Sequence, residues 1–102
     1  MLNINVLYIY PKIIEVNKEI NLFRIIDNNI KETIILFCIK EDSKYEIKLT
    51  NTLHGQVMSL CEVSTLEELD KIMIKFKEVE CDFSILNDLN EIEKYILKLF
   101  KK

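Results

Sequence analysis

The spacing of hydrophobic residues changes partway along this chain, and that change constrains the fold more than any other feature. Up to Val63, apolar side chains alternate with polar ones or form short runs, a pattern typical of β-strands. From Leu66 onward they recur every three or four residues, which is typical of amphipathic α-helices. The sequence therefore predicts a β-rich N-terminal part followed by helices.

Several N-terminal segments have strand patterns. Leu2–Tyr10 alternates and stops at Pro11, which has no N–H to donate to a neighbouring strand. Lys31–Lys40 contains the unbroken apolar run Ile34–Ile39, which predicts burial on both faces and hence a central position in the sheet. The remaining strands are expected at Tyr45–Thr50 and at residues 56–63.

Residues 12–27 fit two interpretations. As strands, Lys12–Val16 and Ile20–Asp27 flank a turn at Asn17-Lys18. As a helix starting at Pro11, the same residues spread apolar side chains around the whole circumference. Their many β-branched residues favour the strands. With only one glycine available, we expect Asn28-Asn29, with positive φ, and Asp42-Ser43 to form the hairpin turns.

Two helices follow. Ser64 or Thr65 caps the first, Glu67 or Glu68 completes a capping box, and Glu67 forms an i,i+4 pair with Lys71. The second begins near Asn87 or Asn90 and continues to the C-terminus. Their apolar stripes are Leu66, Leu69, Ile72, Met73 and Phe76, and then Leu89, Ile92, Ile96, Leu99 and Phe100.

Each helix has one apolar face and therefore needs one partner surface. The simplest arrangement is an α+β fold, in which an antiparallel β-meander of about five strands carries two C-terminal α-helices packed on it. We expect residues 1–102 to form one compact domain, because the chain shows no repeat, linker or low-complexity segment.

Acidic residues gather in the second half of the chain. Between Glu62 and Glu93 there are ten acidic residues and three lysines, a local balance of −7, whereas the whole chain carries −3. A solvated helix face accounts for most charge runs of this kind. The alternative is that the run faces a basic partner surface, and the candidate partner-binding residues are then Glu67, Glu68, Asp70, Glu78, Glu80 and Asp82, with Glu62 beside them.

The composition argues against direct binding to nucleic acid or membranes. Arg24 is the only arginine among 14 basic residues, and no basic stripe is visible. Tyr8, Tyr10 and the other aromatic residues are therefore expected to pack in the core or on the sheet rather than to stack on bases. The longest apolar run is far shorter than the ~20 residues that a membrane-spanning helix needs.

No catalytic or metal-binding motif stands out. His54, the only histidine, lies beside Gly55, the only glycine, and is expected to be an exposed turn residue. Cys38 and Cys61 lie in apolar strands, where a thiol is usually inert packing. A single glycine excludes phosphate-binding glycine loops, and carboxylates one or two residues apart on a helix point in different directions. We expect no enzyme activity, no metal and no cofactor.

Cysteine usage and the N-terminus favour a cytoplasmic protein. Cys38, Cys61 and Cys81 are odd in number and widely spaced, which favours free thiols in a reducing compartment. Residues 1–5 lack the basic segment of a signal peptide.

By exclusion, the sequence predicts a small protein that works by binding another protein with a basic surface. The favoured role is a phage- or plasmid-type inhibitor, such as an anti-CRISPR, that blocks a nucleic-acid-handling enzyme through an acidic face. The alternatives are an immunity protein or antitoxin that neutralises a toxin, and a self-associating accessory subunit. A homodimer would depend on an apolar edge or face, and Leu2–Tyr10 is the candidate segment.

Overall fold

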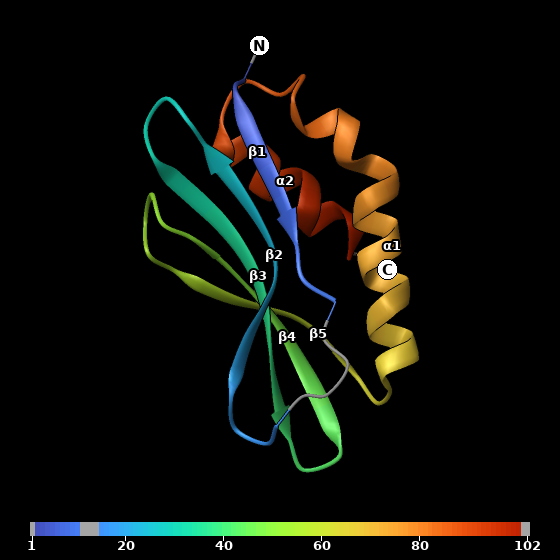
Figure 1. Ribbon diagram of the computed structural model, residues 1–102. Coiled ribbons are helices and arrows are strands. Elements are labelled where there is room, and N and C mark those ends of the chain that lie inside the picture. The colour runs from blue at the N-terminus through green and yellow to red at the C-terminus, as the bar shows by residue number, and fades with distance from the viewer. Residues whose placement is uncertain (1, 11–14, 101–102) are drawn as a thin grey trace.

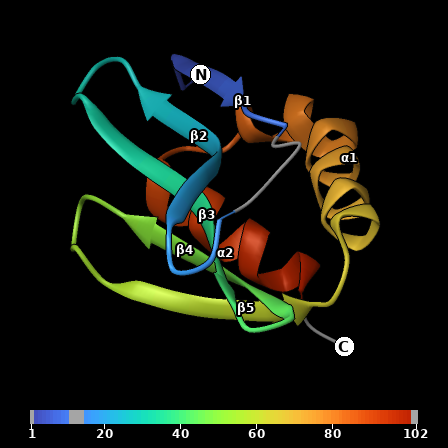
Figure 2. The ribbon, with the colours of Figure 1, turned by 60° about the horizontal axis from the view of Figure 1, so that its bottom comes forward.

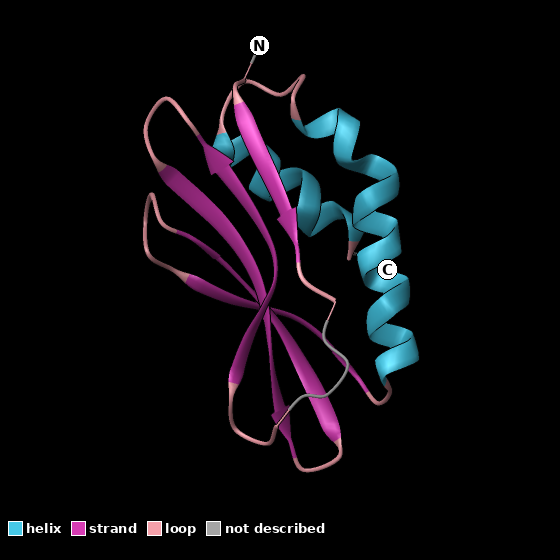
Figure 3. Cartoon of the chain, in the orientation of Figure 1, coloured by secondary structure: helices cyan, strands magenta, loops and turns pink. Residues whose placement is uncertain are grey.

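Five strands precede two helices in the computed structural model, which describes residues 2–10 and 15–100 (Figures 1 and 3). The predicted α+β fold is confirmed. Its elements are β1 (Ile4–Tyr8), β2 (Glu19–Asp27), β3 (Glu32–Glu41), β4 (Lys44–Asn51), β5 (Val57–Val63), α1 (Leu66–Phe83) and α2 (Leu89–Leu99).

The strands form one antiparallel meander in the order β1-β2-β3-β4-β5, with β3 in the predicted central place. Both helices lie against the same face of this sheet (Figures 1 and 2). We call the other side the outer sheet face. The unbroken apolar run predicts burial on both faces of β3. The helices cover one face; on the other, Phe37 is buried and Ile35 and Ile39 are half-buried, so this prediction is confirmed in part.

A β-bulge at Leu22 decides which side chains of β2 face the helices. The strand register jumps from Asn21 opposite Phe37 to Phe23 opposite Leu36, so Leu22 is the extra residue. A one-residue shift exchanges the two faces of a strand. The bulge therefore places Phe23 and Ile25 in the core and turns Arg24 to the outer sheet face.

The helical interpretation of residues 12–27 is wrong over β2. The turn predicted at Asn17-Lys18 is present, and Asn17 adopts a positive φ of 63°. Val16, the last residue of the other predicted strand, forms only a single bridge with Lys40. Residues 12–14 lie outside the described residues.

The hairpin turn predicted at Asn28-Asn29 is present between β2 and β3, but the positive φ lies elsewhere. Asn28 and Asn29 do not have positive φ; Lys31 does, at 61°. The Lys31 N–H donates to the Asp27 carbonyl at 2.8 Å, and the Asn29 N–H donates to the Asp27 carboxylate at 2.9 Å. The Asp27 side chain thus fixes the start of the turn, and Lys31, the residue with left-handed backbone, lies at its end.

The helix starts follow capping chemistry. The Thr65 hydroxyl caps α1 by accepting the Glu68 N–H at 3.1 Å, which confirms one of the two predicted caps. Asp88, rather than Asn87 or Asn90, caps α2 by accepting the Glu91 N–H at 2.9 Å. The second helix ends at Leu99, before the C-terminus.

The core lies between the sheet and the helices. Phe23 of β2 stacks on Phe76 of α1 with ring centroids 4.8 Å apart, and both side chains are excluded from solvent. Burying an aromatic side chain of this kind contributes roughly 1.5–3 kcal/mol. The predicted stripe residues Leu69, Met73 and Phe76 of α1, and Leu89, Ile92 and Ile96 of α2, are all buried.

Candidate functional site

The outward face of α1 carries part of the acidic run. Its residues recur at the spacing that keeps side chains on one side of a helix, and all of them are exposed. We define the outward face of α1 as Glu67, Asp70, Lys71, Ile74, Glu78 and Cys81.

An exposed isoleucine lies at the centre of this face. Ile74 is 53% exposed and lies one helical turn from both Asp70 and Glu78. An exposed apolar side chain flanked by carboxylates can contact a partner that is basic at its rim and apolar at its centre.

The three carboxylates of this face have no intramolecular partners among the described residues. Glu67, Asp70 and Glu78 take part in no salt bridge or side-chain hydrogen bond there. The predicted Glu67–Lys71 ion pair does not form. Since both side chains are exposed, solvation offsets most of what a surface pair contributes.

Glu68 belongs to the helix cap instead of the outward face. Its carboxylate accepts the backbone N–H of Ser64 at 3.2 Å, while its own N–H donates to the Thr65 hydroxyl. The predicted capping box is therefore present, with Glu68 reaching one residue beyond the cap. Its charge also complements the positive end of the helix dipole.

Asp82 faces α2. The Tyr95 hydroxyl donates to its carboxylate at 2.8 Å, and the Tyr95 ring meets Phe83 edge-on with centroids 5.7 Å apart. The hydrogen bond to Asp82 raises the pKa of Tyr95, because it favours the protonated phenol. Asp82 therefore joins the two helices.

Glu80 faces the end of β1. Burial raises the pKa of Tyr8, and the negative charge of the half-buried Glu80 raises it further. The Tyr8 ring packs against Phe23 and lies 5.6 Å from the Lys77 ammonium. Tyr8 therefore packs against the core, as the sequence predicts, and Glu80 is part of that packing.

Glu62 lies apart from α1. It is exposed on β5, next to Glu46 of β4 in the register, and its nearest cation is Lys44 at 3.7 Å. This register places it on the outer sheet face. The structure thus brings together Glu67, Asp70 and Glu78 and separates them from Glu62, Glu68, Glu80 and Asp82.

His54 is engaged at both ring nitrogens. Nε2 lies 2.9 Å from a carboxylate oxygen of Glu93 on α2, and Nδ1 accepts the Gln56 N–H at 3.1 Å. His54 is exposed in the β4–β5 turn, as predicted, and its side chain also ties this turn to α2. A general base needs a free nitrogen to accept a substrate proton, and both nitrogens here are occupied.

Asn51 reinforces the same junction. This fully buried residue accepts the Leu53 N–H at 3.0 Å and donates to Asn90 of α2 at 3.3 Å. Neither Asn51 nor Glu93 is evident from the sequence, because each partner lies 39 residues away and no local motif joins them.

The cysteines lie on different elements and are free. Burial raises the pKa of the Cys38 thiol to about 11 and also raises the pKa of Cys61. A thiol with a raised pKa is a poor nucleophile at neutral pH. Within residues 2–10 and 15–100, no three side chains of metal-binding type gather into a cluster.

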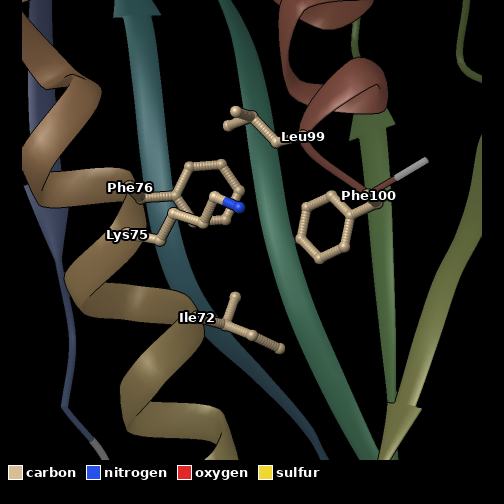
Figure 4. A pocket seen from close by; sticks show the side chains of 5 residues that line it. All are labelled: Ile72, Lys75, Phe76, Leu99 and Phe100. Carbon is tan, nitrogen blue, oxygen red and sulfur yellow. The ribbon is translucent and has the colours of Figure 1, made fainter. Parts of the chain in front are cut away.

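An apolar crevice between the two helices is too small for a ligand. Ile72 and Phe76 from α1 face Leu99 and Phe100 from α2, with Lys75 at the rim (Figure 4). The crevice has a volume of about 30 Å³, which is room for about one water molecule.

In the described part of the chain, neither helix is long and apolar enough to cross a bilayer.

Comparison with known proteins adds no family. No protein-family model, curated protein or solved structure matches this chain.

Proposed function

We propose that this chain is a non-enzymatic protein that binds a basic surface of a partner protein through the outward face of α1. One observation carries the proposal. Glu67, Asp70 and Glu78 line one helix face around the exposed Ile74, they outnumber the single lysine of that face, and none of them forms a salt bridge with a described residue. Such a face is complementary to the lysines and arginines with which a nucleic-acid-handling enzyme holds its substrate.

The role we propose is an inhibitor of such an enzyme, of the kind encoded by phages and plasmids, anti-CRISPR proteins included. An immunity protein or antitoxin would use the same electrostatic principle against a toxin and differs only in its partner. The free cysteines support placing this function in the reducing cytoplasm.

The test reverses charge on this face and, in a matched control, on a separate surface. The binding variant is E67K/D70K/E78K. The control is E41K/D42K/E62K, which makes the same change in net charge at exposed positions of the β3–β4 hairpin and β5. Each immobilised variant is incubated with host lysate at low and high salt.

We expect the wild type and the control to retain a basic protein at low salt, and the binding variant to lose it. Three reversals should slow association with the purified partner by about tenfold or more, because steering depends on charge. If the captured protein is a nuclease or toxin, adding the wild type should reduce its activity. Equal retention by the binding variant would refute the assignment of this face.

A further inference from the structure

The outer sheet face is apolar over half of its width. Its central row is Ile35, Phe37 and Ile39 of β3, extended by Ile26 of β2 and Leu7 of β1. Leu7 is 49% exposed, Ile35 and Ile39 are half-buried, and Phe37 between them is 7% exposed; no helix lies over this row (Figures 1 and 2).

The neighbouring strand shows what an uncovered face normally carries. Outward side chains of β4 are Glu46, Lys48 and Thr50, as expected where one side of an antiparallel sheet faces water. The β3 row next to it has the composition of a covered strand. This contrast within one sheet makes the β3 half the candidate surface for a contact with another molecule.

Arg24 supplies the charge within this apolar half. The register places it between Leu7 and Ile35 on the outer sheet face. Its Nε atom is buried, and among the described residues it has neither a hydrogen-bond partner nor a salt bridge. A half-buried guanidinium on apolar surroundings is the type of side chain that anchors protein interfaces, and it requires an acceptor.

The centre of this face, on β2 and β3, is complementary to itself. In the register, Arg24 lies beside Ile35, Asn21 beside Phe37, and Glu19 beside Ile39. The apolar row is therefore symmetric about Phe37, with one isoleucine on either side. The opposite charges of Arg24 and Glu19 lie at equal offsets on either side, roughly 7 Å each at the rise of a β-strand. Glu19 is exposed and has no ion-pair partner among the described residues.

We propose that the outer sheet face binds a second copy of this chain about a two-fold axis that passes beside Phe37 and runs across the strands. This symmetry brings Ile35 against Ile39 of the partner subunit. It also brings Arg24 against Glu19 of the partner subunit, and the reciprocal pair forms at the same time. Two sheets commonly pack face to face with nearly aligned strands, and two-fold symmetry is the commonest symmetry of homodimers.

The dimer is independent of the function proposed for α1. The helices lie on the opposite side of the sheet, so both outward faces of α1 stay exposed in the dimer (Figure 1). Failure of either proposal therefore leaves the other standing, provided that each is tested with its own variants.

Charge exchange tests the pairing directly. R24E and E19R each place like charges at both contacts. Loss of one pair raises the dissociation constant of the dimer about tenfold, so loss of both raises it about 100-fold. An equimolar mixture of R24E and E19R restores both contacts in a heterodimer, and the double variant R24E/E19R restores them in a homodimer. Mass is measured by sedimentation velocity, and circular dichroism checks folding.

We expect a dimeric wild type, two monomeric single variants, and dimers from both the mixture and the double variant. I35K should also dissociate the dimer, whereas I74K, a similar change at an exposed isoleucine of α1, should not. A monomeric wild type would overturn the proposal, as would single variants that stay dimeric or a mixture that stays monomeric. If R24E misfolds, R24Q and E19Q each remove both pairs without adding like charges and should still weaken the dimer, and their equimolar mixture restores one of the two pairs.

Discussion

The Tyr95 hydroxyl donates a 2.8 Å hydrogen bond to the Asp82 carboxylate, and this bond joins the middle of α2 to the last turn of α1. It explains why Asp82 faces inward whereas Glu78, one turn earlier, faces solvent. It also separates two kinds of acidic residue that look the same in the sequence: those that hold the fold together and those that remain available for a partner.

Replacing Tyr95 with phenylalanine should lower the free energy of unfolding by about 1 kcal/mol, because the hydrogen bond to Asp82 is lost while the ring packing stays. Urea unfolding monitored by circular dichroism measures the change. Tyr10→Phe is the matched control, since this ring is 48% exposed and should leave stability unchanged. Equal stability of Tyr95→Phe and wild type would show that the bond contributes nothing.

Replacing the buried Asn51 with leucine should cost about 1–3 kcal/mol, because it removes the hydrogen bonds to the Leu53 N–H and to the Asn90 side chain. Thermal or urea unfolding measures the loss. Asn29→Leu is the control, because Asn29 is exposed in the β2–β3 turn. A loss no larger than that of the control would contradict the role of Asn51 at the junction.

Alkaline pH should destabilise the fold through Cys38. Burial raises its pKa from 9.0 to about 11, so between these values the folded state holds a proton that the unfolded state releases. The stabilising contribution is complete below pH 9 and is lost as the pH rises through 11. Because Cys38→Ala removes this titration, the stability of wild type relative to the variant should fall by up to about 2 kcal/mol over that interval.

Unfolding free energies of wild type and Cys38→Ala, measured in steps of pH, test this expectation. A constant difference between the two proteins would contradict it. Thiol labelling of the native protein at neutral pH gives an independent check, since exposed Cys81 should react before buried Cys38.

Asp42→Gly should stabilise the β3–β4 hairpin by about 0.5–1 kcal/mol. Asp42 is the first residue of this two-residue turn and has a φ of 52°, a conformation that glycine adopts without a steric penalty. Ser43→Gly is the matched control, because Ser43 does not have positive φ and the same change there only adds freedom to the unfolded chain. Unfolding midpoints compare the two, and a gain at Ser43 instead of Asp42 would contradict this description of the turn.

Local chemistry made most of the fold predictable. The period-2 patterns located the strands, and the apolar run Ile34–Ile39 identified the central one, because a strand that lacks polar outward residues must sit away from the sheet edge. The cap at Thr65 and the stripe through Phe76 defined the first helix. Each of these signals lies within a few residues of the feature that it predicts.

The candidate site was only partly predictable for the same reason. The sequence places six acidic residues between Glu67 and Asp82, and helical spacing alone puts three of them on one face. That Glu80 lies beside Tyr8 and Asp82 beside Tyr95 depends on how β1 and α2 pack on α1. His54 likewise meets Glu93 only because the β4–β5 turn lies over α2.

By itself, the sequence determined the element types, their order and the apolar faces that had to be buried, because periodicity and capping act over one or two turns of chain. Only the tertiary structure decided which side of β2 faces outward. The bulge at Leu22 shifts the strand by one residue, and that shift brings Phe23 into the core and Arg24 out onto the open sheet. Its position depends on the pairing of two strands, whose combined packing no local pattern encodes.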